Sequence, residues 1–294
     1  MLPPVIAAVD GSAESLAAAD WAAREAVRRE RPLRLVHVWN WHPRQDAGEP
    51  ATAAQRHLAR RALRQAEERV HRTCPGVRVE DEQMEGPATA ALLKAAEQTD
   101  LLVLGSRGLS GFTGFLVGSV ALGVVARAAC PVVLVRADEG PADERFPGDT
   151  GDVGDVVLGI DPTGPCDEVI EFAFEAARSR GARLRAVYAW QPPSPIGLGA
   201  GDIGLLTGPE RAEEWLGFLS AVLQVWREKY PGVEALETVT EDRARSALLR
   251  AASGAGLLVV GRRVTDRPAG PRTGPVTHAA IHHVGCPVAV VPHD

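Results

Sequence analysis

The sequence predicts two tandem α/β domains, each a five-stranded parallel sheet with helices on both faces in a flavodoxin-like layout. Three observations predict this fold class. The length of 294 residues suits about two domains. The chain repeats itself, because VIAAVD at 5–10 returns as VVLGID at 156–161, and LLVLG at 101–105 returns as LLVVG at 257–261. In each copy, short apolar runs alternate with longer amphipathic segments, which is typical of parallel strands joined by crossover helices.

Each element of the first copy follows from its own pattern. Short runs of apolar and β-branched residues predict strands at 5–9, 33–39, 77–81, 101–104 and 132–135. The amphipathic segments between them predict helices at 13–30, 51–73, 87–98 and 119–129. Pro87 suits the first turn of its helix, where a backbone N–H is not needed. The second copy repeats this order from 156–160 to 288–291.

The repeat also predicts the domain boundaries. The first domain is expected at 1–137 and the second at 153–294. The stretch 138–152 between them contains Gly-Pro, Pro-Gly and several acids without apolar periodicity, which predicts a linker. The offset between the copies grows from 151 to 156 residues along the chain, so the second copy carries an insertion. This insertion falls in the Gly- and Pro-rich loop 191–209, whose role the sequence leaves open.

The composition excludes several classes of protein. Hydrophobic residues make up 45% and charged residues 24%, as in ordinary globular proteins. A net charge of −6 gives no overall attraction to nucleic acid or to anionic membranes. No apolar run approaches the ~20 residues that span a bilayer, and the first residues lack the basic region of a signal peptide. Four cysteines without Cys-x-x-Cys spacing indicate reduced thiols, so we expect a cytoplasmic protein with neither nucleic-acid nor membrane partners.

A glycine-rich loop follows the fourth strand of the first copy. Its fixed points are Gly105, Gly108 and Gly118, and Ser119 comes next. Glycine lets the backbone turn sharply and approach a bulky anion, and the helix expected to begin at Ser119 presents unpaired N–H groups and a positive dipole end. Arg107 is the one cation of this stretch and can meet phosphate oxygens. A flexible surface loop is the alternative, but long glycine-rich loops between a strand and a helix usually serve a function, so the pattern favours a phosphate site.

Two further features share this edge of the sheet, where ligands of open parallel sheets bind. Asp10, Gly11 and Ser12 follow the first strand, although taken alone they fit a helix N-cap equally well. Val38 lies at the end of the second strand, where a main-chain group and a small apolar side chain can hold a flat base.

The loop carries neither of the common nucleotide motifs. It has no Gly-Lys-Ser/Thr, so no lysine reaches the β- and γ-phosphates. No Gly-x-Gly-x-x-Gly follows the first strand either. The loop is therefore expected to hold a nucleotide more than to turn it over.

With these residues, the chain resembles the universal stress protein family. Nucleotide-binding members carry Gly-x2-Gly-x9-Gly-Ser/Thr after the fourth strand and an aspartate after the first, and this sequence has both. The resemblance covers nearly the whole chain, twice, and implies a tandem member with two adenine nucleotide α-hydrolase-like domains. It implies ATP or a related adenine nucleotide as ligand, often accompanied by Mg²⁺.

The same resemblance implies which residues surround the nucleotide. Asp10 and Val38 are expected near adenine and ribose, with Gly11 and Ser12 beside Asp10. The residues expected around the phosphates are Gly105, Arg107, Gly108, Gly118, Ser119 and Val120. Because such domains commonly pair through their last strands, tandem copies also imply an internal pseudo-dimer, and two chains are expected to pair into a homodimer.

The second copy departs from this pattern. It keeps Asp161, Gly261 and Gly274, but Val264 stands at the position of the second loop glycine and Pro275 at that of the loop serine. A β-branched side chain disfavours a close phosphate approach, and proline removes both the N–H and the hydroxyl donor. We expect a weaker second site or none. Three arginines can partly compensate by charge: Arg262, Arg263 and Arg272.

Other candidate sites are weaker. His278 and His282 are four residues apart on a predicted helix, but no carboxylate or cysteine with ligand spacing accompanies them, so surface or interface histidines are the better interpretation. Cys130 and Cys286 each precede a proline and are interpreted as small buried residues. The basic run over 56–69 is diluted by acids and indicates a solvated helix face.

The leading hypothesis is a cytoplasmic ATP-binding regulator of stress response or dormancy that is not an enzyme. Any hydrolysis should be slow, because the loop offers no obvious base to position water. Two alternatives stay open. One is a nucleotide-hydrolysing or ligase-type enzyme on the same fold, although such enzymes usually carry a Ser-Gly-Gly-x-Asp-Ser-type loop where this chain has DGSA at 10–13. The other is an interaction scaffold whose nucleotide is structural.

Overall fold

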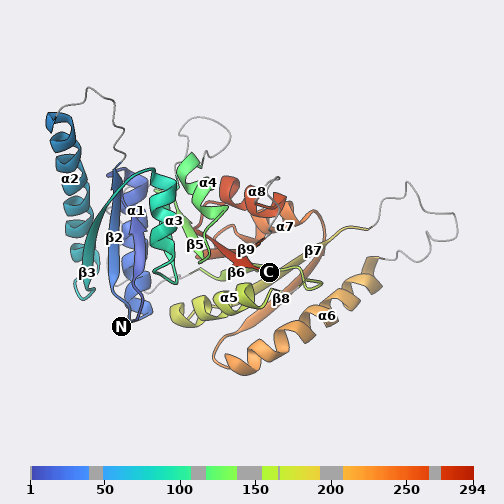
Figure 1. The fold of residues 1–294 in the computed structure, drawn as a ribbon. Coiled ribbons are helices and arrows are strands. Elements are labelled where there is room, and N and C mark those ends of the chain that lie inside the picture. Colours follow the sequence, from blue (N-terminus) through green and yellow to red (C-terminus); the bar gives the residue numbers. More distant parts are fainter. Residues whose placement is uncertain are drawn as a thin grey trace.

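A single ten-stranded sheet runs through the chain (Figure 1). The computed structural model describes residues 2–39, 49–106, 117–137, 154–164, 166–192, 208–264 and 273–294. The predicted linker 138–152 and most of the predicted insertion loop, 193–207, lie outside these residues. Within the described residues, no helix is both long enough and apolar enough to cross a membrane.

The first half forms five parallel strands in the order β3-β2-β1-β4-β5. The strand order reverses between β1 and β4, which is where open α/β sheets bind ligands. Its elements are β1 (Val5–Ala8), α1 (Ala13–Arg28), β2 (Leu33–Trp39), α2 (Glu49–Thr73), β3 (Val79–Glu85), α3 (Ala88–Ala96), β4 (Leu102–Gly105), α4 (Ser119–Val125) and β5 (Val132–Val135).

The second half repeats this plan as β10-β9-β6-β7-β8, again with parallel neighbours. The doubly wound fold predicted for both copies is therefore confirmed. Its elements are β6 (Val156–Gly159), α5 (Asp167–Arg180), β7 (Leu184–Trp190), α6 (Gly208–Lys229), β8 (Ala235–Glu241), α7 (Ala244–Ala251), β9 (Leu257–Arg263), α8 (Pro275–His283) and β10 (Val288–His293).

The two halves join at the antiparallel pair β5–β10, which we call the seam. Its register places Val132 opposite Val290 and Leu134 opposite Val288. All four side chains are buried. The last strands of the two copies thus pair with one another, which is the internal pairing expected from the tandem repeat.

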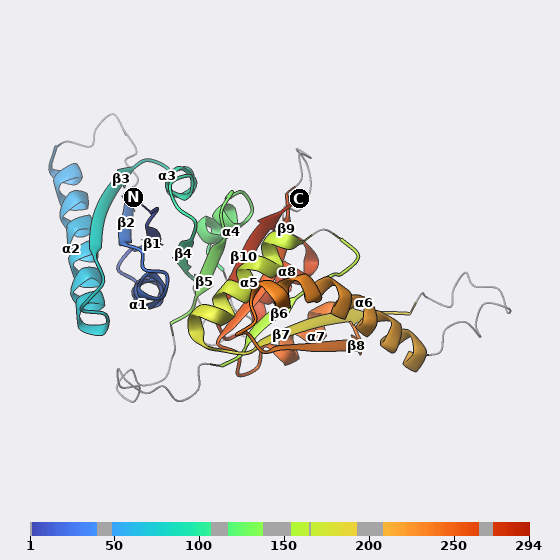
Figure 2. The ribbon, with the colours of Figure 1, turned by 90° about the horizontal axis from the view of Figure 1, so that it is seen from below.

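Helices cover both faces of the sheet (Figure 2). The helices α1, α2, α5 and α6 pack on one face and α3, α4, α7 and α8 on the other, and each face has its own apolar core extending across both halves. Apolar strands such as β4, which is buried on both sides, are what such a sandwich requires.

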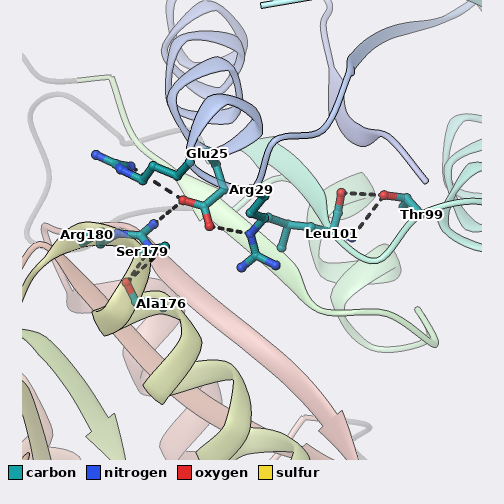
Figure 3. A network of polar contacts seen from close by, with 8 residues as sticks. Glu25, Arg29, Thr99, Leu101, Ala176, Ser179 and Arg180 are labelled. Carbon is teal, nitrogen blue, oxygen red and sulfur yellow. Dashed lines mark hydrogen bonds and ion pairs between the residues drawn. The ribbon is translucent and has the colours of Figure 1, made fainter. Parts of the chain in front are cut away.

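A buried ion-pair network crosses the seam on the first of these faces (Figure 3). The side chain of Glu25 in α1 is fully buried, and its Oε2 lies 2.6 Å from Nη2 of Arg180 in α5. Its Oε1 accepts a hydrogen bond from Nε of Arg29 at 2.7 Å. Burial alone would raise the pKa of Glu25, but the charges of Arg180 and Arg29 hold it below its ordinary value. Burial in turn lowers the pKa of Arg180 to about 10.

Several predicted boundaries were wrong. The third strand begins at Val79 and not at residue 77, because the stretch 75–77 forms a turn in which the N–H of Val77 donates to the carbonyl of Cys74. Pro87 precedes α3 as its N-cap residue, with an extended ψ of 122°, and does not lie in its first turn. The helix predicted at 119–129 ends at Val125, and the one predicted at 87–98 ends at Ala96.

Candidate functional site

A cavity of about 280 Å³ opens at the carboxyl ends of the first-half strands. The strands β1, β2 and β4 form its floor, and α1, α3 and α4 supply its walls. It therefore lies at the reversal point of the strand order, where the sequence predicted a ligand site.

The turn at Asp10 closes one side of this cavity. Oδ1 of Asp10 accepts hydrogen bonds from the N–H and the hydroxyl of Ser12, at 2.9 and 2.5 Å. Gly11 lies between them with φ of +85°, a left-handed conformation that favours glycine. Ser12 also caps α1, since its Oγ accepts from the N–H of Ser15 at 3.2 Å. The helix-cap interpretation of this turn is thus correct, and the turn still borders the cavity through Asp10 and Ser12.

Gly118 borders the cavity at the start of α4. It is the N-cap residue, with φ of −61° and ψ of 150°, a conformation open to any residue. Among the residues that the structure describes, which leave out 107–116, no atom lies within 4 Å of a Cβ atom added there. Ser119 and Val120 follow it along the cavity wall. The described part of the chain thus leaves space beside the first N–H groups of α4, and the backbone there has no need of glycine's conformational freedom.

Gly105 also borders the cavity, but its physical role differs from the prediction. It shows no left-handed φ and ends β4 in regular pairing with Val135. A Cβ atom added there would lie only 2.7 Å from the backbone of Glu14 and of Ser15. Glycine is therefore required because α1 packs directly on the strand, whereas the prediction assigned it to a sharp turn near an anion.

Apolar side chains form the inner wall. Val36 and Val38 come from β2, and Leu104 comes from β4. The sequence prediction missed Ala88 and Leu92 of α3, which also line the cavity. The apolar spacing of the 87–98 segment was the available signal, but it was used only to predict the helix. A cavity lined both by these apolar side chains and by the polar turn at Asp10 suits a ligand with an aromatic part and a hydroxyl-rich part.

Most of the residues predicted to bind the nucleotide line this cavity. Gly11 does not line the cavity and acts by shaping the turn. Arg107 and Gly108 lie outside the described residues. The predicted residues that line the cavity are Asp10, Ser12, Val38, Gly105, Gly118, Ser119 and Val120.

The second half keeps the acidic turn. Oδ1 of Asp161 accepts from the N–H and the hydroxyl of Thr163, at 3.0 and 2.7 Å, as Asp10 does from Ser12. A Cβ atom added at Gly164 would lie 3.1 Å from Nη2 of Arg263, so that guanidinium lies against the turn.

The second half differs where the phosphate loop would begin. Here β9 continues past Gly261 and pairs with β10 as far as His293, and the N–H of Val264 donates to the carbonyl of His293 at 2.7 Å. A Cβ atom added at Gly261 would lie 2.7 Å from Nε2 of His293 and 3.3 Å from Val169 of α5. The His293 ring therefore fills the place that the α1 backbone takes at Gly105. Gly274 precedes α8, and Pro275 is its first residue.

One predicted compensation was wrong. Arg262 was expected to offer its charge to a phosphate in the second half, but it is only 6% exposed and its guanidinium donates to the carbonyl of Ala128 in the first half. Arg272 lies outside the described residues.

The remaining candidates are the histidines of α8 and the cysteines. The rings of His278 and His282 lie 4.3 Å apart on α8, and among the described residues no group of three or more histidines, cysteines or acids could hold a metal. All four cysteines are free thiols. Burial raises the pKa of Cys130 and of Cys286 to about 11, which keeps both thiols protonated at neutral pH.

Comparisons with known proteins agree with the repeat and the fold. The sequence model of the universal stress protein family matches residues 1–136 and 153–292. A universal stress protein of Mycobacterium tuberculosis is 30% identical over 97% of this chain and 96% of its own length. One of Mycolicibacterium smegmatis is 31% identical over 98% and 96%. In fold, the chain is similar to the crystal structure of a universal stress protein from Archaeoglobus fulgidus, with a TM-score of 0.73, 18% identity, and coverage of 99% of this chain and 98% of that one.

Proposed function

Because the chain belongs to the universal stress protein family, with two copies of the family domain, we propose that it is a cytoplasmic ATP-binding regulator of stress response or dormancy. ATP would bind in the cavity of the first half, residues 1–137. Binding would change the protein's shape or its partners. The four free thiols agree with a reducing compartment.

The open space at Gly118 is the observation that carries this proposal. The position tolerates any residue conformationally, and a Cβ atom there would touch no atom of the described residues. Packing among the described residues therefore gives no reason for glycine, whereas a bulky anion close to the backbone does. The adjacent N–H groups of α4 would donate to phosphate oxygens, together with the hydroxyl of Ser119.

The rest of the cavity suits the other parts of the nucleotide. Adenine would lie against the apolar wall that includes Val38, and the ribose hydroxyls would face Asp10. Arg107 and Gly108 would complete the phosphate contacts. Mg²⁺ would enter with ATP and supply charge neutralisation of the phosphates, as it does at many nucleotide sites.

We further propose that ATP is held with little or no hydrolysis, because no Walker lysine is present in the loop. The second half, residues 153–294, would bind nucleotide weakly or not at all through Asp161, Gly261 and Gly274. Pro275 lacks the N–H that Ser119 offers, and the N–H of Val264 is already used by His293. Two such chains would then pair into a homodimer, as the family resemblance implies.

Titration calorimetry with ATP, ADP, AMP and cyclic AMP tests this function. The expected result is ATP binding with one site per chain, together with adenine nucleotide released from freshly purified protein. Absence of both heat and co-purified nucleotide would rule out the proposed function. Two equal sites per chain would keep the function but overturn the proposed difference between the halves, and rapid pyrophosphate or phosphate release would favour an enzyme instead.

A further inference from the structure

Two arginines reach across the seam and bind the ends of helices in the opposite half. Arg262 at the end of β9 donates from Nη2 to the carbonyl of Ala128, just beyond α4. Arg136, directly after β5, donates from Nη2 to the carbonyl of Ile281 in the last turn of α8 at 2.9 Å. Ile281 is among the last carbonyls of α8, which have no partner within the helix, so a cation there satisfies an acceptor and offsets the negative end of the helix dipole. Ala128 follows α4, and Arg262 satisfies its carbonyl just beyond the helix end.

The Arg262 contact is linked to the cavity through the backbone hydrogen bonds of α4 and of the turn that follows it. The N–H of Leu122 donates to the carbonyl of Gly118, and the N–H of Ala126 donates to that of Leu122, both at 3.0 Å. The N–H of Ala128 closes the helix on Val124 at 2.8 Å. Arg262 binds the chain just after the C-terminal end of α4. The N-terminal end of α4 carries the cavity-lining residues from Gly118 onward.

Burial makes this contact hard to replace. Arg262 is 6% exposed and Ala128 is 2% exposed, so water has little access to either partner once the other is removed. A buried carbonyl without a donor carries its full desolvation cost. The end of α4 would then have to shift to find another donor, and the residues at its start would move with it.

We propose that Arg262 of the second half is a positioning residue for the nucleotide site of the first half. It touches no part of the cavity and acts by fixing α4, and hence the N–H groups that follow Gly118. The inference rests on the proposed function, since it concerns affinity at that site. It also gives the second half a role that does not depend on binding nucleotide itself.

The chain provides a control, because Arg136 also donates across the seam to a helix end, at the carbonyl of Ile281 in the last turn of α8. Arg136→Met removes a half-buried seam arginine from a helix end in the same way, but the helix that it releases lies in the second half. Arg263→Met removes the neighbouring, exposed arginine of β9. A purely structural role for Arg262 predicts that Arg262→Met and Arg136→Met both lower the melting temperature and both leave ATP affinity unchanged.

The experiment measures ATP affinity and melting temperature for the full-length protein and for Arg262→Met, Arg262→Lys, Arg136→Met and Arg263→Met. We expect Arg262→Met to weaken ATP binding by about fivefold or more, within the range of coupling between distant sites. Arg262→Lys should recover part of the loss, and the other two variants should bind like wild type. Hydrogen exchange in the nucleotide-free protein should show faster exchange at the amides of 122–128 in Arg262→Met alone.

The outcomes separate this inference from the function on which it rests. If wild type binds ATP and Arg262→Met binds equally well, the positioning role is wrong and the proposed function stands. Equal weakening by Arg136→Met would also overturn it, because the effect would then be general loss of stability. If wild type itself takes up no nucleotide, the proposed function and this inference both fail.

Discussion

Gly105 and Gly118 border the same cavity, yet replacing them should separate stability from binding. At Gly105, an alanine Cβ would lie 2.7 Å from two backbone atoms of α1, about 0.7 Å short of an ordinary contact at 3.4 Å. Backbone cannot rotate away as a side chain does, so α1 must retreat from β4. Overpacking of this kind costs about 1–3 kcal/mol, or roughly 2–12 °C in melting temperature for a protein of this size.

Gly118→Val should behave in the opposite way. Its backbone conformation suits valine, and its added atoms begin in space that no described residue occupies. The loss of a glycine N-cap costs at most about 1 kcal/mol. The isopropyl group would occupy the space beside the N–H groups of α4, so ATP affinity should fall by about 100-fold or more, equivalent to about 2.8 kcal/mol.

Both variants are measured by thermal unfolding without ligand and by ATP titration calorimetry, with wild type as reference. Gly118→Ala, which adds a single carbon, gives the graded intermediate for binding. The reasoning fails if Gly118→Val binds ATP like wild type, or if Gly105→Ala melts at the wild-type temperature. If Gly118→Val loses binding only in proportion to a large loss of stability, the assignment of open space at this position is wrong.

Three further predictions concern the scaffold. Glu25→Gln should lower the free energy of unfolding by about 3–5 kcal/mol at pH 7, because it leaves the buried guanidinium of Arg180 without its counter-charge. In the folded protein the pKa of Glu25 lies below its ordinary value of 4.5. The stabilisation from its charge is therefore fully present above pH 4.5 and is lost as the pH falls through the pKa of the folded state. The urea unfolding curves of variant and wild type should accordingly converge in acid. Gly11→Ala should lower the free energy of unfolding by about 1–2 kcal/mol in the same assay, because φ is +85° at this position. An unchanged urea midpoint would argue against that conformation. Cys130, with a pKa of about 11, should be only about 0.1% thiolate at pH 8 and should react with a maleimide far more slowly than a free cysteine, a result that labelling at the rate of free cysteine would contradict.

The sequence predicted the parts of the fold that depend on apolar patterning. Buried strands such as β4 and β5 have continuous apolar runs, and the long helices have clear amphipathic spacing, so their existence was evident. β3 was misplaced because it is an edge strand of mostly charged residues, VEDEQME, whose only strong apolar neighbour, Val77, belongs to the preceding turn. Such a strand is specified by its pairing with β2, which local pattern does not reveal.

The candidate site was predictable where the motif fixes residue type and spacing, as at Asp10 and Gly118. The reason for Gly105 was not, because its close neighbour Glu14 belongs to a helix 91 positions earlier in the chain. Arg262 was misassigned for a related reason. Its partner, the carbonyl of Ala128, lies in the other copy, and comparing the copies position by position does not reveal such a side-chain contact across the seam.

The seam has a consequence for how the two copies can diverge. When separate identical chains pair, each substitution is present twice and must suit both sides of the contact. Here the partner is tethered, so dilution does not separate the pair and each position is encoded once. The two cross-seam arginines make use of this freedom: the first-copy counterpart of Arg262 is Ser106, and the second-copy counterpart of Arg136 is Pro292. The contact between the copies therefore pairs its two last strands in a two-fold register, while the side chains on its two sides differ in chemistry.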